Sequence, residues 1–334
     1  MSQSGEIVTL PRSELKEGNL LLKKNEIVQL STIESVNQQS KASTEGYLTE
    51  PPLVRANISS PDRIGQLGDL TTDPIDLWLT GTGTPADYTK CGPSQVLRIR
   101  DDVIIVDAGH GIVEQLTKLG IELDQVTYIF ITHHHIDHII DLGKLLMFSW
   151  VKGGQAPHQA PIIIGPRGTI EYVNRLFAAF DYDIRVRVPH HYDIKAVAPA
   201  VVEIADGDSI RGACWEAVAF RVDHYPVDQA FGYLFKTGNQ TIVISGDTRP
   251  SENLINYAQN ADVLIHEVIY EGFGFPEYHT LSTDVGKVAE LAKVKKLVLS
   301  HLLPGNRQDQ EWIEHAKKDY GGPVIVGKDL LKII

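Results

Sequence analysis

Ile131-Thr132-His133-His134-His135-Ile136-Asp137-His138 carries four metal-capable side chains on one short turn. The pattern is His-x-His-x-Asp-His, with its defined positions at His133, His135, Asp137 and His138. Neutral imidazoles and carboxylates are the ligands that divalent zinc, manganese and iron prefer. His134 is expected to point away from the ions, because neighbouring side chains of an extended turn face opposite sides. The turn therefore predicts part of a metal site.

The residues on either side of this turn predict where it lies in the fold. The apolar run from Val126 to Ile131 leads into it and reads as a buried strand, and Ile139 to Trp150 has helical spacing. Ligands at the end of a strand are typical of active sites built on sheets. Four side chains cannot complete the shells of two ions, so we expect further ligands at the ends of later strands.

Three later side chains have the required chemistry, and each follows an apolar run: His224, Asp247 and His301. Together with the turn they make a set of seven candidate ligands, which suffices for two ions if one carboxylate bridges them. We assign one ion to His133, His135 and His224. The other ion is assigned to Asp137, His138 and His301, and the bridge to Asp247.

Length and composition bound the class of protein. The chain has 334 residues, 43% hydrophobic and 22% charged, which is ordinary for a globular enzyme. It has no apolar run of membrane-spanning length, and its first residues lack the basic and apolar regions of a signal peptide. Two cysteines do not make a disulfide framework. These features predict a cytoplasmic protein that does not bind membranes.

The charge of the chain is strongly negative. The formal net charge is −12, and residues 76–334 alone carry 24 Lys and Arg against 33 Asp and Glu. This balance argues against a broad phosphate-binding surface for nucleic acid. It does not exclude a small anionic substrate, because two divalent cations would make the site itself locally positive.

The order of apolar runs predicts two packed sheets with helices on the outside. Residues 1–75 are interpreted as an irregular N-terminal extension that packs on the core or on a partner subunit of a homodimer, and residues 76–334 as the domain that carries the candidate ligands. Within that domain, Ile170 to Phe180 has helical spacing, whereas Arg185 to Val188 alternates like a strand.

The motifs together resemble the metallo-β-lactamase superfamily, which implies an αββα sandwich, an α+β fold of four layers with two metals at the sheet edges. Over roughly residues 76–334 they are similar to the ribonuclease Z and arylsulfatase-type branch. The motifs that carry this likeness, besides the histidine turn, are Gly81-Thr82-Gly83-Thr84-Pro85, Asp107-Ala108-Gly109, His224 followed by Gly232-Tyr233, Ser245-Gly246-Asp247-Thr248-Arg249-Pro250, and His279-Thr280 followed by Ser282. The resemblance implies that His279 acts near the leaving group.

Two departures from the superfamily narrow the expected substrate. β-Lactamases of this fold lack a bridging aspartate at the position of Asp247, which argues against β-lactam hydrolysis. Ribonuclease Z carries an inserted basic arm that clamps tRNA, whereas Gly165 to His224 has scattered arginines and no lysine cluster. With the negative net charge, this second departure leads us to expect that nucleic acid is not a substrate.

We therefore expect a dinuclear metal-dependent hydrolase that attacks a small ester: a phosphodiester, a sulfate ester, or a carboxylic ester or lactone. Zinc is the first choice of metal, with manganese and iron as alternatives. A hydroxide held between the ions would be the nucleophile, Asp137 would bind metal and orient it, and His279 would protonate the leaving oxygen. The alternatives are a ribonuclease Z-type endonuclease acting on the 3′ end of tRNA, a non-catalytic metal-binding protein and a diiron redox protein. The residues leave the physiological substrate, the metal, the oligomeric state and the role of residues 1–75 open.

Overall fold

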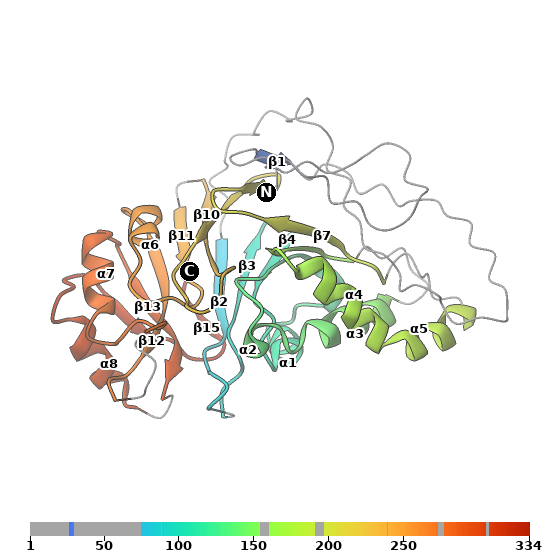
Figure 1. Cartoon of the computed structure of the whole chain (residues 1–334), viewed down its shortest axis with the longest axis horizontal. Coiled ribbons are helices and arrows are strands. Elements are labelled where there is room, and N and C mark those ends of the chain that lie inside the picture. The colour runs from blue at the N-terminus through green and yellow to red at the C-terminus, as the bar shows by residue number, and fades with distance from the viewer. Residues whose placement is uncertain are drawn as a thin grey trace.

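Short apolar strands build two β-sheets that face each other, and helices cover both outer faces (Figure 1). The computed structural model describes residues 27–29, 75–87, 89–153, 160–190, 197–238, 240–272, 277–304 and 307–334. The four layers are helices, sheet, sheet and helices. One apolar core lies between the two sheets, and one lies between each sheet and its helices. The predicted αββα sandwich is confirmed.

The first sheet has seven strands in the order β15-β2-β3-β4-β5-β6-β7. Strands β2, β3 and β4 pair antiparallel, and β4 through β7 run parallel to one another. The carboxyl ends of the parallel strands therefore open at one edge, where the histidine turn follows β5. The strands are β2 (Ile75–Gly81), β3 (Ser94–Ile99), β4 (Asp102–Val106), β5 (Val126–Phe130), β6 (Ile162–Pro166), β7 (Ala200–Ile204) and β15 (Leu331–Lys332).

The second sheet has eight strands in the order β1-β8-β9-β10-β11-β12-β13-β14. Strands β8 to β11 pair antiparallel, and β11 to β14 are parallel. The strands are β1 (Ile27–Gln29), β8 (Ser209–Arg211), β9 (Glu216–Arg221), β10 (Phe231–Thr237), β11 (Gln240–Ile244), β12 (Val263–Ile269), β13 (Leu297–Leu303) and β14 (Val324–Val326).

The expected N-terminal extension, residues 1–75, falls mostly outside the described residues. Within it, β1 pairs in parallel with β8, with Ile27 opposite Ser209. The proposed boundary between an extension and a hydrolase domain stays a prediction.

The helices divide between the two outer faces (Figure 1). Those from the first half of the chain lie on the β2–β7 sheet, and those from the second half on the other sheet. No helix in the described ranges is both long and apolar enough to cross a bilayer. The helices are α1 (Ile112–Lys118), α2 (Ile136–Ile139), α3 (Leu142–Gly153), α4 (Thr169–Ala179), α5 (Asp181–Arg187), α6 (Glu252–Tyr257), α7 (Val285–Leu291) and α8 (Asp309–Ala316), with short 3-10 turns at Leu123–Gln125 and Val188–His190.

The strand predicted from Arg185 to Val188 is wrong, because this segment ends helix α5. Two ion pairs at helical spacing stabilise that helix: Asp181 with Arg185, and Asp183 with Arg187, each at 2.8 Å. Such pairs form only when residues four apart share one face of a helix. They explain why alternating valines and arginines do not make a strand here.

Phe130, the last residue of β5, joins the two sheets through the inner core. Its ring meets the rings of Tyr233 and Phe235 edge-on, with centroids 5.1 and 5.2 Å apart. The Tyr233 hydroxyl donates a 2.6 Å hydrogen bond to the carbonyl of Ile131, the first residue after β5. Because aromatic packing and this bond fix the end of the strand, they also fix where the histidine turn begins.

Candidate metal centre

Asp107, directly after β4, holds the histidine turn in place through hydrogen bonds. Its carboxylate accepts hydrogen bonds from the backbone N–H and the hydroxyl of Thr132, both at 2.8 Å. It also accepts one from Nδ1 of His138 at 2.7 Å. The carboxylate is buried, and the backbone of Asp107 has a φ of 60°, a left-handed conformation that is uncommon for a residue with a side chain.

These bonds decide which nitrogen of each ring carries the proton. Asp107 can only accept, so Nδ1 of His138 carries a proton and Nε2 is the nitrogen that faces the centre of the cluster. The Thr132 hydroxyl donates its hydrogen to Asp107. Its oxygen therefore accepts a hydrogen bond from Nδ1 of His133 at 3.0 Å. The carbonyl of Tyr278 likewise fixes Nδ1–H of His224 at 2.9 Å. All three Nε2 atoms are thus prepared as metal ligands.

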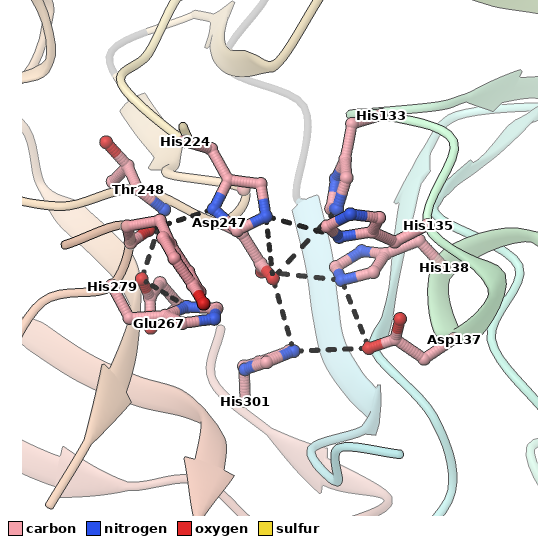
Figure 2. Close-up of polar contacts among 12 residues, drawn as sticks. His133, His135, Asp137, His138, His224, Asp247, Thr248, Glu267, His279 and His301 are labelled. Carbon is pink, nitrogen blue, oxygen red and sulfur yellow. Dashed lines mark hydrogen bonds and ion pairs between the residues drawn. The ribbon is translucent and has the colours of Figure 1, made fainter. Parts of the chain in front are cut away.

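The seven predicted ligands meet at one place between the sheets (Figure 2). They come from the turn after β5, the segment after β9, the end of β11 and strand β13. Ligand atoms within 4.8 Å of one another form three groups, one of which joins His279 to Asp247 and His301, and the other two contain the seven candidate ligands. The first group is His133, His135, His224 and Asp247, and the second is Asp137, His138 and His301.

Asp247 lies between the two groups, as Figure 2 shows. Its carboxylate oxygens are 4.0 Å from Nε2 of His133 and 3.9 Å from Nε2 of His224 on one side. On the other side they are 3.4 Å from Nε2 of both His138 and His301. A carboxylate that faces both sets of imidazoles is in the position of a bridge.

A β-bulge aims His301 at the centre. In the pairing of β12 with β13, Glu267 lies opposite Ser300 and Val268 opposite Leu302, so His301 has no partner. Its φ of 50° is unusual for a residue with a side chain. Bulges often redirect a side chain beside an active site, and here Nε2 of His301 lies 3.3 Å from Asp137.

The charges of the cluster shift the pKa values of its carboxylates and histidines. Burial would raise the pKa of Asp247, but His301 and His138 outweigh it and hold that pKa well below its ordinary value. Burial also raises the pKa of Asp137, yet the same two histidines bring it down to about 2. For His133 burial dominates and lowers the pKa well below its ordinary value, which keeps the ring neutral. Both carboxylates are ionised at neutral pH, as ligands must be.

Buried ring nitrogens without hydrogen-bond partners indicate that this cluster can hold divalent cations. Nε2 of His133 and of His138 are buried and have no hydrogen-bond partner. Nδ1 of His135 and Nε2 of His224 face each other at 3.2 Å. Unpartnered buried nitrogens are costly, and cations at the centre would satisfy them. The described cluster can therefore hold metal.

His279 lies beside this centre with a carboxylate behind it. Its Nδ1 donates to Oε1 of Glu267 at 3.1 Å, and the same oxygen accepts the backbone N–H groups of Thr248 and Thr280. Burial lowers the pKa of His279, but the charge and hydrogen bond of Glu267 outweigh it and raise the pKa to about 9. His279 also lies within 4.8 Å of Asp247 and His301, so it can reach a group held there.

Sequence reasoning did not assign roles to Asp107 and Glu267, although each is an acidic residue that follows apolar residues in a strand. Their function depends on contacts with residues far along the chain, which no spacing reveals. The prediction for His134 agrees with the geometry: its Nε2 lies 2.9 Å from the hydroxyl of Thr169, away from the cluster.

Comparisons with known proteins match the part of the chain that contains the metal centre. The family model described as Anti-Pycsar protein Apyc1 matches residues 75–319. Among curated proteins, ribonuclease Z of Mycobacterium bovis (strain BCG / Pasteur 1173P2) is 31% identical over 277 residues, which cover 78% of this chain and 98% of the relative. Ribonuclease Z of Mycobacterium marinum is 33% identical over 278 residues, with the same coverage.

Solved structures show the same fold at lower identity. The metallo-β-lactamase fold protein YhfI from Bacillus subtilis has a TM-score of 0.63 and 21% identity, over 78% of this chain and 99% of that protein. The short form of human tRNase Z has a TM-score of 0.56 and 23% identity, over 78% and 98%. The superfamily suggested by the motifs, and its ribonuclease Z branch, are confirmed.

The expectation that nucleic acid is not a substrate is wrong by these comparisons, because the curated relatives at 31–33% identity are named ribonuclease Z. The error came from using the net charge of −12 as a property of the binding site. Net charge describes the whole surface, whereas a cation-filled centre can attract phosphate locally within an acidic protein.

Proposed function

Because this chain belongs to the Anti-Pycsar protein Apyc1 family, within the ribonuclease Z branch of the metallo-β-lactamase superfamily, we propose that it hydrolyses a phosphodiester bond in a nucleotide substrate. The observation that carries the proposal is the convergence of seven ligand side chains on one centre, with His279 and Glu267 beside it. Membership of the family makes the protein a metal-dependent hydrolase, and the names of the relatives favour RNA as the source of the bond.

In this proposal the seven residues hold two divalent ions, with zinc as the first candidate. His133, His135 and His224 would hold one ion and Asp137, His138 and His301 the other, with Asp247 between the two sets. Two such ions would lower the pKa of bound water and neutralise charge on a phosphoryl group. Asp107, Thr132 and the Tyr278 carbonyl keep the imidazoles in the right tautomer for this.

Two side chains of the protein handle the protons. Asp137 is ionised and 3.3 Å from His301, so it can orient an attacking water as well as bind metal. His279 is held protonated by Glu267 and can donate a proton to the leaving oxygen. Donation matters for a ribose oxygen, because an alkoxide is a poor leaving group at neutral pH. The pair thus suits a phosphodiester of a sugar.

The test compares initial rates of the zinc- or manganese-loaded protein on three nitrophenyl substrates: a phosphodiester, a sulfate and a carboxylic ester. Asp247→Ala is the inactive comparison, and Asp319→Ala, at an exposed position, is the matched control. We expect phosphodiester hydrolysis that is lost only in Asp247→Ala. Preferential hydrolysis of the sulfate or the carboxylic ester would refute the proposal.

Two further substrates distinguish a phosphodiester bond in RNA from one in a small nucleotide. A tRNA precursor with a 3′ extension presents it in RNA, and a 3′,5′-cyclic nucleotide presents it in a small molecule. Cleavage of the precursor at the 3′ side would identify a ribonuclease Z-type endonuclease. Cleavage of the cyclic nucleotide alone would restrict the substrate to small nucleotides.

A further inference from the structure

A pocket of about 480 Å³ lies directly beside the metal centre, and none of the roles described above uses it. Its volume is within the range of pockets that bind small molecules, roughly 300–1,000 Å³. Its wall consists of the segment from Arg221, the last residue of β9, to Asp228, together with Asp206, Ser251 and Asn253. His224 belongs both to this wall and to the metal cluster. The pocket and the metal cluster therefore adjoin at His224.

The charges of the pocket exclude the phosphate group as its occupant. Asp206, Asp223 and Asp228 line it with Arg221. The guanidinium of Arg221 already donates to the carbonyl of Asp228, and Asp223 is bonded to Arg249 at 2.6 Å. Carboxylates repel phosphate, but they accept hydrogen bonds from sugar hydroxyls and from base amino groups. The pocket suits the neutral part of a nucleotide.

Tyr225 supplies the surface on which a base can lie. It follows His224 in the chain, lines the pocket and is 67% exposed, which is unusual for a large aromatic side chain. Nucleobases stack on such rings, and each stack contributes a substantial part of the binding of an unpaired nucleotide. The exposed ring is complementary to the flat base of a nucleoside, and the acidic lining is complementary to its hydroxyl and amino groups.

We propose that this pocket is the nucleoside subsite of the enzyme, with Tyr225 stacking on the base next to the phosphate held at the metals. The inference rests on the proposed function, because it specifies what part of the substrate lies beside the scissile bond. It adds Tyr225 and the pocket to the residues of the metal centre.

Binding of a nucleoside monophosphate tests the subsite without turnover. The dissociation constants of cytidine and adenosine 5′-monophosphate are measured by calorimetry on the metal-loaded protein and compared with that of methyl phosphate, which lacks a nucleoside. We compare wild type, Tyr225→Ala, Tyr225→Phe and the control Tyr182→Ala, whose ring is 74% exposed on α5. Because Tyr225 is exposed, its removal leaves the core intact.

The expected result is that the nucleoside improves binding about tenfold over methyl phosphate. Tyr225→Ala should lose this gain, whereas Tyr225→Phe and Tyr182→Ala should keep it. Equal binding of the nucleotides by Tyr225→Ala and wild type would overturn the subsite. Failure of the proposed function looks different: nucleotide binding would still depend on Tyr225, but no phosphodiester would be hydrolysed.

Discussion

Glu267 holds His279 by a hydrogen bond of 3.1 Å between Oε1 and Nδ1, and this pair lies next to the seven candidate metal ligands. The two residues come from β12 and from the segment before α7, twelve positions apart. The same carboxylate oxygen accepts two backbone N–H groups. The geometry therefore separates a proton-donating pair from the metal-binding set, and the two can be tested apart.

Replacing His279 with alanine should slow hydrolysis according to the leaving group. General acid catalysis contributes about 10²- to 10⁴-fold, so a loss of that size is expected when the leaving oxygen belongs to ribose. A nitrophenolate leaves without a proton, and its release should slow far less. Rates on both substrates, with metal content measured on the same samples, check this. Equal losses on both, or a loss of metal, would show that His279 is a ligand or a structural residue.

Replacing Glu267 with glutamine should move the alkaline limit of activity to lower pH. In wild type the carboxylate raises the pKa of His279 to about 9 against the opposing effect of burial. His279 acts as an acid below that pKa and loses its proton as the pH rises through it. Metal ions nearby lower the pKa, so the limit should lie below pH 9 in both proteins. A pH profile of kcat/KM that is the same in both would refute the pairing.

Replacing Asp107 with asparagine should weaken metal binding without touching a ligand. The asparagine can no longer accept from Thr132 and His138 as a carboxylate does, so the ring of His138 loses its fixed tautomer. Loss of such a partner typically costs about 10- to 100-fold in metal affinity. Zinc affinity is measured by competition with a chelator, with the exposed Asp319→Asn as control. An affinity equal to wild type would contradict the role of Asp107.

Replacing Gly109 with alanine should disturb the turn that carries Asp137. A Cβ at this position would lie 2.4 Å from the carbonyl carbon of Gly92 and 2.6 Å from the carbonyl oxygen of Asp137. Both are backbone atoms that cannot rotate away, so a loss of about 1–3 kcal/mol in the free energy of unfolding is expected. Gly321→Ala is the control, because nothing lies within 4 Å of its Cβ. Chemical denaturation of both variants measures the difference, and unchanged stability in Gly109→Ala would contradict the contact.

The candidate ligands could be selected from the sequence because strong local signals mark them, and the structure brings their side chains together. Asp247 follows the apolar strand β11, and parallel strands of a sheet end at one edge. His301 follows the apolar residues Leu297 to Leu299 in the sequence, but it lies inside β13, at the β-bulge. The strand at Arg185 was wrongly predicted because side-chain alternation and helical ion pairs compete in a short polar segment. The role of Glu267 could not be predicted, since its partners depend on how the loop before α7 returns to the sheet.

The N-terminal part shows another limit of sequence reasoning. Residues 1–75 have no stable period of apolar residues, and periodicity is the main signal for secondary structure. The strand Ile27–Gln29 gains its pairing from β8, about 180 residues along the chain, rather than from its own pattern. Such non-local pairing is the part of a fold that a single sequence conveys least.

The central claim is that two metal ions held by the seven residues drive phosphodiester hydrolysis. The most direct measurement is a zinc titration into chelator-treated protein, with bound metal and phosphodiester turnover followed on the same sample. The account predicts that turnover rises with bound zinc and reaches its plateau at two ions per chain, and that Asp247→Ala, which lacks the carboxylate between the two groups, neither fills both positions nor turns over substrate. Turnover that persists without metal, or full activity in Asp247→Ala, would contradict it.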